Sequence, residues 1–203
     1  LAMMVFSCTS HADAPPADTD AMFALPRAFY QKLARHFPAG CRVFDDNVVL
    51  AQSYWRVSAE NSYYPNAGVS SLGHALPAAL GAQCHARAPT FAVMGDGGFQ
   101  MCGMEFMTAV NHRLPVNVVV LNNGTLAPIR KNQFQLYGER YTDCDFVNPD
   151  FGLLAAAFGV AHWRVDDAAG LDRLFARADL VNGLNLIELP LDQNAFPRYR
   201  AAR

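Results

Sequence analysis

The sequence predicts an α/β fold, in which a mostly parallel sheet is flanked by helices on both faces to give a three-layer sandwich. Two observations predict it. Helix-like and strand-like segments alternate from residue 26 to residue 190, which is the pattern of α/β domains. Short helical crossovers separate the successive strands, and a strand that feeds such a crossover pairs in parallel with a neighbour in the same sheet.

The expected elements follow one another with few interruptions. In the first half we expect a helix over residues 26–36, a strand over 41–46 (CRVFDD), a polar and aromatic loop over 52–66, a helix over 73–87 and a strand over 91–95 (FAVMG). In the second half we expect a helix over 103–113, a strand over 116–122 (VNVVVLN), an irregular segment over 124–148, a helix over 149–159, a strand over 160–166, a helix over 171–180 and a strand over 184–190. The strands are the apolar and β-branched runs, and the helices are the longer segments between them.

The chain divides into a short leading part and one domain. Residues 1–8 (LAMMVFSC) lack a positively charged start and follow no initiating Met, so we interpret them as the last strand of a preceding domain rather than a secretory signal. Residues 11–20 (HADAPPADTD) have the composition of a linker. We therefore expect the end of a preceding domain and a linker over residues 1–21, and a single packed domain over residues 22–203.

Composition excludes several classes of function. The formal net charge of the 203 residues is -2 with both signs dispersed, so the sequence indicates neither nucleic-acid nor membrane-surface binding. The five cysteines lack a CxxC spacing, which argues against a zinc site or a disulfide framework and favours reduced thiols in a cytoplasmic protein. No apolar run approaches the ~20 residues of a membrane span. The expected partners are small molecules or protein.

The most informative motif joins two neighbouring strands. Gly95-Asp96-Gly97 follows the strand over 91–95, and 24 residues lie between Gly97 and Asn122-Asn123 at the end of the next strand. Taken separately, Asp-Gly and Asn-Asn-Gly are ordinary turn and strand-end sequences. Together, with a helix-length spacer, they place Asp96 and Asn123 on adjacent strand tips facing a ligand. Oxygen ligands of this kind, with phosphate oxygens, suit Mg²⁺.

With this motif the sequence resembles the thiamine diphosphate-dependent enzymes, whose signature is GDG followed after about two dozen residues by NN. The segments GDGGFQM, TAVNHRLPVNVVVLNN, YGERY, NPDF and AAAFGV are most similar to the acetolactate synthase branch. The resemblance covers residues 26–197 and implies the thiamine diphosphate-binding fold of the C-terminal, diphosphate-binding domain. The pyrimidine-binding and middle domains of such enzymes have no counterpart in this chain, and FAD would belong only to that absent middle domain.

The resemblance assigns roles to individual residues. Mg²⁺ would be held by the Asp96 carboxylate, the Asn123 side chain and the backbone carbonyl of Thr125. Gly97, Gly98 and Phe99 would precede the next helix, with their amides directed at phosphate. The implied cofactor-binding residues are Ser70, Ser71, Leu72, Gly95, Asp96, Gly97, Gly98, Phe99, Asn123, Thr125 and Leu126.

A second segment, Ser70-Ser71-Leu72-Gly73, matches the family's Gly-x-(Met/Leu/Ile)-Gly pattern except at Ser70. The resemblance makes Leu72 the apolar buttress that keeps the cofactor bent, and makes the Ser70 carbonyl the acceptor that orients its amino group. Without the GDG motif, Leu72 would be interpreted as an ordinary core leucine. His74 is interpreted either as a proton donor near substrate or as a helix-start histidine, and Tyr63 and Tyr64 either as cleft-lining or as packing aromatics.

The implied reaction is decarboxylation of a 2-keto acid and transfer of the two-carbon or larger adduct to an acceptor. The family's catalytic glutamate lies in the pyrimidine-binding domain, so we assign no general base here. We expect that domain to come from another chain or a missing segment, in a homodimer or tetramer, and this chain alone to be inactive.

The segment after Asn123 leaves the substrate open. Ala127, Pro128 and Asn132 depart from the acetolactate synthase pattern LGMVRQWQ, which has Trp at the Asn132 position. Residues 131–133 are similar to sulfoacetaldehyde acetyltransferase, and NNGT is similar to benzoylformate decarboxylase. Two alternatives of other classes are a dinucleotide-binding oxidoreductase domain, which GDGGF fits poorly, and a noncatalytic assembly module.

Overall fold

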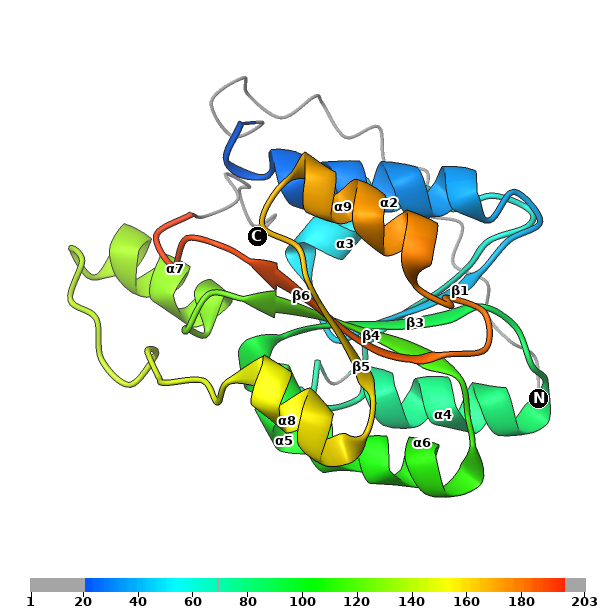
Figure 1. Ribbon diagram of the computed structural model, residues 1–203. Coiled ribbons are helices and arrows are strands. Elements are labelled where there is room, and N and C mark those ends of the chain that lie inside the picture. The colour runs from blue at the N-terminus through cyan, green and yellow to red at the C-terminus, as the bar shows by residue number, and fades with distance from the viewer. Residues whose placement is uncertain (1–20, 69, 196–203) are drawn as a thin grey trace.

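The computed structural model describes residues 21–68 and 70–195 and confirms the predicted three-layer α/β sandwich (Figure 1). One sheet has the strand order β2-β1-β3-β4-β6-β5, and every neighbouring pair is parallel. Its strands are β1 (Arg42–Asp45), β2 (Ser62–Pro65), β3 (Thr90–Gly95), β4 (Val116–Asn122), β5 (Ala161–Arg164) and β6 (Leu184–Pro190). The strand and linker expected within residues 1–20 lie outside the described residues, so the domain division stays a prediction.

Helices cover both faces of this sheet (Figure 1). They are α2 (Ala24–His36), α3 (Val49–Tyr54), α4 (Ala75–His85), α5 (Asp96–Cys102), α6 (Phe106–His112), α7 (Ala127–Leu136), α8 (Phe151–Phe158) and α9 (Ala168–Arg177), with a 3-10 turn η1 (Gly103–Glu105) before α6. Within the described ranges, no helix is long and apolar enough to cross a bilayer.

Two hydrophobic cores hold the layers together. Helices α2, α3 and α9 pack with the sheet in one core, and α4, α5, α6 and α8 pack in the other. Val43 belongs to the first core and its neighbour Phe44 to the second, because successive side chains of a strand point to opposite faces. The same alternation runs through the central strands, which explains their uninterrupted apolar sequences.

The structure corrects the extents of three predicted segments. The expected loop over residues 52–66 contains the end of α3 and the edge strand β2. This strand is too short to show a recognisable alternation of apolar and polar residues. The expected irregular segment over 124–148 contains α7, whose apolar Phe134 and Leu136 are exposed and form no buried stripe in the sequence pattern. The helix expected from residue 103 is preceded by α5, which begins at Asp96 directly after β3.

The strand order changes direction between β1 and β3, in the middle of the sheet. The chain goes from β1 to β2 on one side and then returns to place β3 on the other side of β1. In open α/β sheets, ligands bind outside the carboxyl ends of the strands at such a switch of direction. The tips of β1, β3 and β4 are therefore where a ligand is expected.

Asp45 is a fully buried carboxylate at the tip of β1. It accepts hydrogen bonds from the Val48 amide at 2.7 Å and from the Tyr63 hydroxyl at 2.7 Å, with a longer one from Gln52. Burial outweighs these contacts and raises the pKa of Asp45 to about 6. The folded protein thus holds a proton there that the unfolded chain releases near pH 4.

We expect Asp45 to make the protein less stable as pH rises. Because the folded pKa lies above the unfolded one, its favourable contribution is complete below about pH 4 and is lost as pH rises through about 6. Asp45→Asn removes the titration while keeping an acceptor for Val48. Between pH 4 and pH 7 the wild type should lose about 2–3 kcal/mol of unfolding free energy relative to this variant. Urea titrations at several pH values measure it, and parallel profiles would contradict the assignment.

Candidate functional site

A pocket of about 380 Å³ lies at the carboxyl ends of β1, β3 and β4. We call it the strand-tip pocket. The sequence-predicted residues among those lining it are Ser70, Leu72, Gly95, Asp96, Gly97, Gly98, Asn123, Thr125 and Leu126. Ser71 does not line it, and the Phe99 side chain is buried among Phe106 and Phe151 in a core. The structure thus brings nine residues from three separated segments to one cavity.

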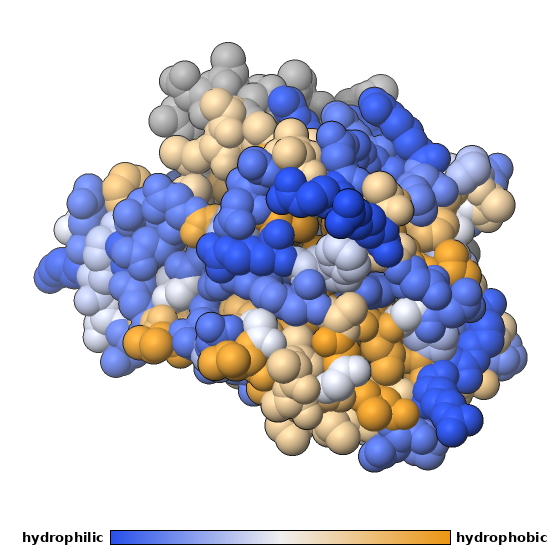
Figure 2. Space-filling model, in the orientation of Figure 1, coloured by the Kyte–Doolittle hydropathy of each residue, from blue (hydrophilic) through white to orange (hydrophobic). Residues whose placement is uncertain are grey.

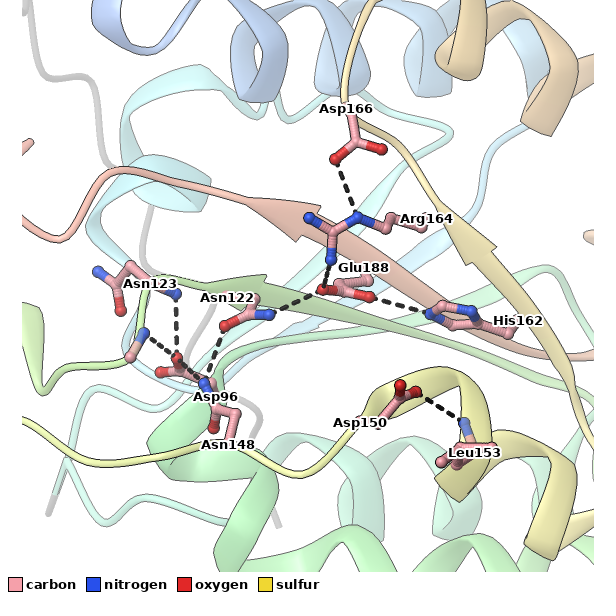
Figure 3. Close-up of polar contacts among 11 residues, drawn as sticks. Asp96, Asn122, Asn123, Asn148, Asp150, Leu153, His162, Arg164, Asp166 and Glu188 are labelled. Atoms are coloured by element: carbon pink, nitrogen blue, oxygen red, sulfur yellow. Dashed lines mark hydrogen bonds and ion pairs between the residues drawn. The ribbon is translucent and has the colours of Figure 1, made fainter.

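Asp96 is the centre of the polar contacts in this pocket (Figure 3). It is only 1% exposed. Its Oδ2 accepts hydrogen bonds from the backbone N–H of Asn123 at 3.0 Å, from the backbone N–H of Gly124 at 2.6 Å and from Asn148 Nδ2 at 2.7 Å. Its Oδ1 accepts one, from the Gly97 amide at 2.9 Å. Since a carboxylate oxygen has two acceptor positions, Oδ1 keeps capacity for a further ligand while Oδ2 is fully engaged.

The donor set suits a hard divalent cation. Among the described residues, no group of three or more His, Cys, Asp or Glu side chains could hold a metal ion. The pocket instead brings together the Asp96 carboxylate, the Asn123 side chain and the buried Thr125. Asn123 Oδ1 lies 3.3 Å from the Thr125 amide nitrogen, so these two residues form one tight turn. One carboxylate with amide and carbonyl oxygens is a set that leaves room for phosphate oxygens around Mg²⁺.

Two glycines of α5 let the backbone approach its neighbours closely. A Cβ at Gly97 would lie 2.6 Å from Leu126 Cδ2, and one at Gly98 would lie 2.3 Å from Asp46 Oδ2. Both residues were expected before a helix, but they are in the first turn of α5 itself. Only glycine leaves this wall of the pocket as bare backbone.

Residues 70 and 72 also line the pocket. Leu72 is half-buried and lines the pocket. Ser70 has φ +54°, a left-handed conformation that disfavours residues with a Cβ. This geometry explains why glycine is the pattern's usual residue at this position and why Ser70 departs from it only at a conformational cost.

Sequence reasoning missed two polar residues of this region. Asp46 follows β1 and lines the strand-tip pocket, and its position at a buried strand tip was a usable signal. Asn148 comes from the loop before α8 and donates from Nδ2 to Asp96 Oδ2 and, at 2.8 Å, to Asn122 Oδ1. Asn122 in turn donates to the buried Glu188 on β6 at 2.8 Å (Figure 3). No local pattern marked Asn148.

Other singled-out residues lie away from the strand-tip pocket. His74 is exposed and precedes α4, as in the helix-start interpretation. Tyr63 bonds Asp45, and Tyr64 stacks on Phe44 with ring centroids 4.5 Å apart, so both serve as packing aromatics. Asn132 is exposed on α7 and is not among the pocket-lining residues.

Residues 46–189 match the family described as thiamine pyrophosphate enzyme, C-terminal TPP binding domain. The chain belongs to this family, as the GDG and NN motifs indicated: it is the domain of a thiamine pyrophosphate-dependent enzyme that binds this cofactor, also called thiamine diphosphate.

Particular relatives differ in their reactions. The sulfoacetaldehyde acetyltransferase of Alcaligenes xylosoxydans xylosoxydans is 34% identical over 73% of this chain and 25% of that protein. The acetolactate synthase isozyme 2 large subunit of Escherichia coli K12 is 35% identical over 64% of this chain and 25% of that protein. The solved thiamine diphosphate-dependent 4-hydroxybenzoylformate decarboxylase of Rhodococcus jostii RHA1 is 25% identical, with a TM-score of 0.72 over 82% of this chain and 32% of that one. The chain thus spans about a quarter of these curated relatives' length.

Proposed function

We propose that the strand-tip pocket binds the diphosphate of thiamine diphosphate together with Mg²⁺. The ion is held by the Asp96 carboxylate, the Asn123 side-chain oxygen and the Thr125 carbonyl, and phosphate oxygens complete the shell. The observation that carries the proposal is the buried Asp96 carboxylate, since three donors fix its Oδ2 while its Oδ1 retains an acceptor position at the pocket.

The whole protein, in this proposal, decarboxylates a 2-keto acid and transfers the remaining two-carbon or larger unit to an acceptor, in the manner of an acetolactate synthase. Thiamine diphosphate supplies the carbanion and the electron sink for this chemistry. The domain described here would bind and orient the cofactor. Asp96 and its neighbours would hold the diphosphate end. Leu72 would keep the cofactor bent, and the Ser70 carbonyl would accept a hydrogen bond from the amino group of the cofactor. Their place around one cavity supports these roles.

Substrate choice falls to α7, because Ala127, Pro128 and Lys131 line the strand-tip pocket. Lys131 is 4% exposed, and a cation in this wall suits an anionic substrate group. This residue and the acetyltransferase relative favour a sulfoacetaldehyde acetyltransferase-type reaction as the second candidate. The decarboxylase with the same fold supports a third, simple decarboxylation of the benzoylformate type.

A working enzyme needs a pyrimidine-binding domain from another chain or from a segment outside this one, in a homodimer or tetramer. Apolar side chains gather over α8 on the face shown in Figure 2. Leu153 of α8 is 72% exposed, and Met104 of η1, the turn before α6, is 70% exposed. Apolar surface of this kind supports assembly through the α8 face.

Calorimetric titration of thiamine diphosphate into the full-length protein, with Mg²⁺ and with EDTA, tests the proposal. We expect binding that EDTA abolishes or strongly weakens. No heat of binding with a folded full-length protein would overturn the cofactor assignment and favour the noncatalytic assembly module.

Asn148 is expected to support the metal ligand indirectly. Asn148→Ala removes one of the three donors to Asp96 Oδ2 and should weaken Mg²⁺-dependent cofactor binding about tenfold, as removal of a ligand's hydrogen-bonding partner commonly does. The matched control is Asn182→Ala in an exposed turn, which should leave affinity unchanged. Equal affinities of the two variants would show that Asn148 is dispensable.

A further inference from the structure

The Asp46 carboxylate contacts the start of α4 from the tip of β1. Asp46 is 2% exposed and lines the strand-tip pocket. Its Oδ2 accepts a hydrogen bond from the Gly73 amide at 2.8 Å, and its Oδ1 accepts from the His74 amide at 2.8 Å and the Ala75 amide at 3.3 Å. Both oxygens are therefore engaged by backbone donors that are far from Asp46 in the sequence.

These contacts replace a local helix cap. The residue at the N-cap of α4, His74, makes no side-chain cap hydrogen bond, so the first amides of this helix depend on Asp46. The negative charge also complements the positive end of the helix. Because Leu72 directly precedes this bonded stretch, the carboxylate fixes where Leu72 enters the pocket wall.

The same carboxylate abuts α5. A Cβ at Gly98 would lie 2.3 Å from Asp46 Oδ2, so this oxygen fills the space that any side chain at Gly98 would occupy. Gly98 is two residues from Asp96 in the first turn of α5. One buried carboxylate thus contacts both the start of α4, next to Leu72, and the helix that carries Asp96.

The adjacent Asp45 shows that this arrangement is specific to one face of the strand tip. Asp45 bonds Val48, Gln52 and Tyr63 and does not line the pocket. Two neighbouring buried acids, the last residue of β1 and the residue after it, therefore serve opposite sides of the sheet, as the alternation of extended chain favours.

We propose that Asp46 is a positioning residue that sets Leu72 at a fixed place relative to the Asp96 loop. The inference rests on the proposed function of the pocket as the cofactor site. Both carboxylate oxygens are needed, because an asparagine offers one acceptor oxygen and turns an NH₂ donor toward the remaining amides. Loss of the hydrogen bonds to either oxygen lets Leu72 and the loop that carries Asp96 move independently.

Amide hydrogen exchange in the cofactor-free protein tests the geometry without any turnover. In Asp46→Asn, the amides of Gly73, His74 and Ala75 should exchange about tenfold faster than in wild type, since hydrogen bonds to a charged acceptor are lost. In Asp45→Asn, the matched variant at the neighbouring buried acid, the same three amides should keep their wild-type protection. Unchanged exchange in Asp46→Asn would overturn the proposal.

Cofactor affinity tests the positioning role. Calorimetry with thiamine diphosphate and Mg²⁺ should show binding about 10–100-fold weaker in Asp46→Asn than in wild type, with Asp45→Asn near wild type. Wild-type affinity in Asp46→Asn would overturn the positioning role alone. Failure of the wild-type full-length protein to bind would instead overturn the proposed function, and the exchange result would still report on the Asp46 contacts.

A double-mutant cycle tests the contact between Asp46 and Gly98 directly. Gly98→Ala should weaken affinity by displacing the carboxylate, while Asp46→Ala removes the atoms with which the new methyl collides. Gly98→Ala should therefore weaken affinity less in the Asp46→Ala background than in the wild-type background, because contacting residues are coupled. Additive losses would contradict the contact and overturn the proposal.

Discussion

Replacing Asp96 by alanine is expected to abolish Mg²⁺-dependent binding of thiamine diphosphate. Asp96 supplies the one carboxylate of the proposed metal site, and the remaining ligands, an amide and a carbonyl oxygen, are uncharged. Mg²⁺ parts reluctantly with its water and is held in such sites chiefly by carboxylate and phosphate oxygens. Calorimetry with and without EDTA should detect no metal-dependent component in the variant. Binding equal to wild type would remove Asp96 from the metal site.

The same variant should also lose stability, which the experiment must separate from lost binding. Asp96 is buried and accepts hydrogen bonds from three backbone amides and Asn148. Leaving these donors unpaired costs about 2–3 kcal/mol, so Asp96→Ala should unfold earlier in urea but remain folded at room temperature. Asp150→Asn, a conservative change of the carboxylate that caps α8, is the matched control and should keep both binding and stability.

The pairing of β3 with β4, the two strands that carry the GDG and NN motifs, could be predicted from the sequence because its cause is local. A buried apolar strand, a helix-length spacer and a second apolar strand have few parallel arrangements, and β3 and β4 are neighbours with Gly95 opposite Leu121. Asp96 and Asn123 follow those strand ends and consequently meet. The family match over residues 46–189 confirms the resemblance that this spacing indicated.

The roles of Asp46 and Asn148 could not be predicted from the sequence, because they depend on contacts between distant segments. Asp46 bonds an amide 27 residues away and Asn148 bonds a carboxylate 52 residues away, so no window of sequence contains both partners. The helix α7 was missed for another reason: it lies beyond the strand tips (Figure 1) and exposes apolar residues, so its sequence lacks a regular buried face. Pro128 at its start suits a first helical turn but is equally common in loops.

Replacing Leu72 by alanine is expected to separate binding from catalysis in the full-length enzyme. Leu72 lines the strand-tip pocket and directly precedes the amides that Asp46 accepts from, whereas in the proposed function the diphosphate and metal contacts would come from the Asp96 and Asn123 loops. If the proposed roles hold, shortening this side chain would remove the apolar contact that keeps the cofactor bent and would leave the proposed metal ligands in place. We expect thiamine diphosphate affinity to change by less than about threefold and kcat to fall about 100-fold, the cost of a reacting group displaced by about 1 Å.

The control for Leu72 is Leu136→Ala, because Leu136 is an exposed leucine on α7 that is not among the pocket-lining residues. It should leave affinity and kcat at wild-type values. Steady-state kinetics with saturating cofactor, alongside calorimetry, distinguishes the outcomes for Leu72→Ala. A parallel loss of affinity and kcat would mean that Leu72 merely fills the pocket wall. Unchanged kcat would remove it from the site, since a buttress that only packs against its own domain has no effect on the reacting end of the cofactor.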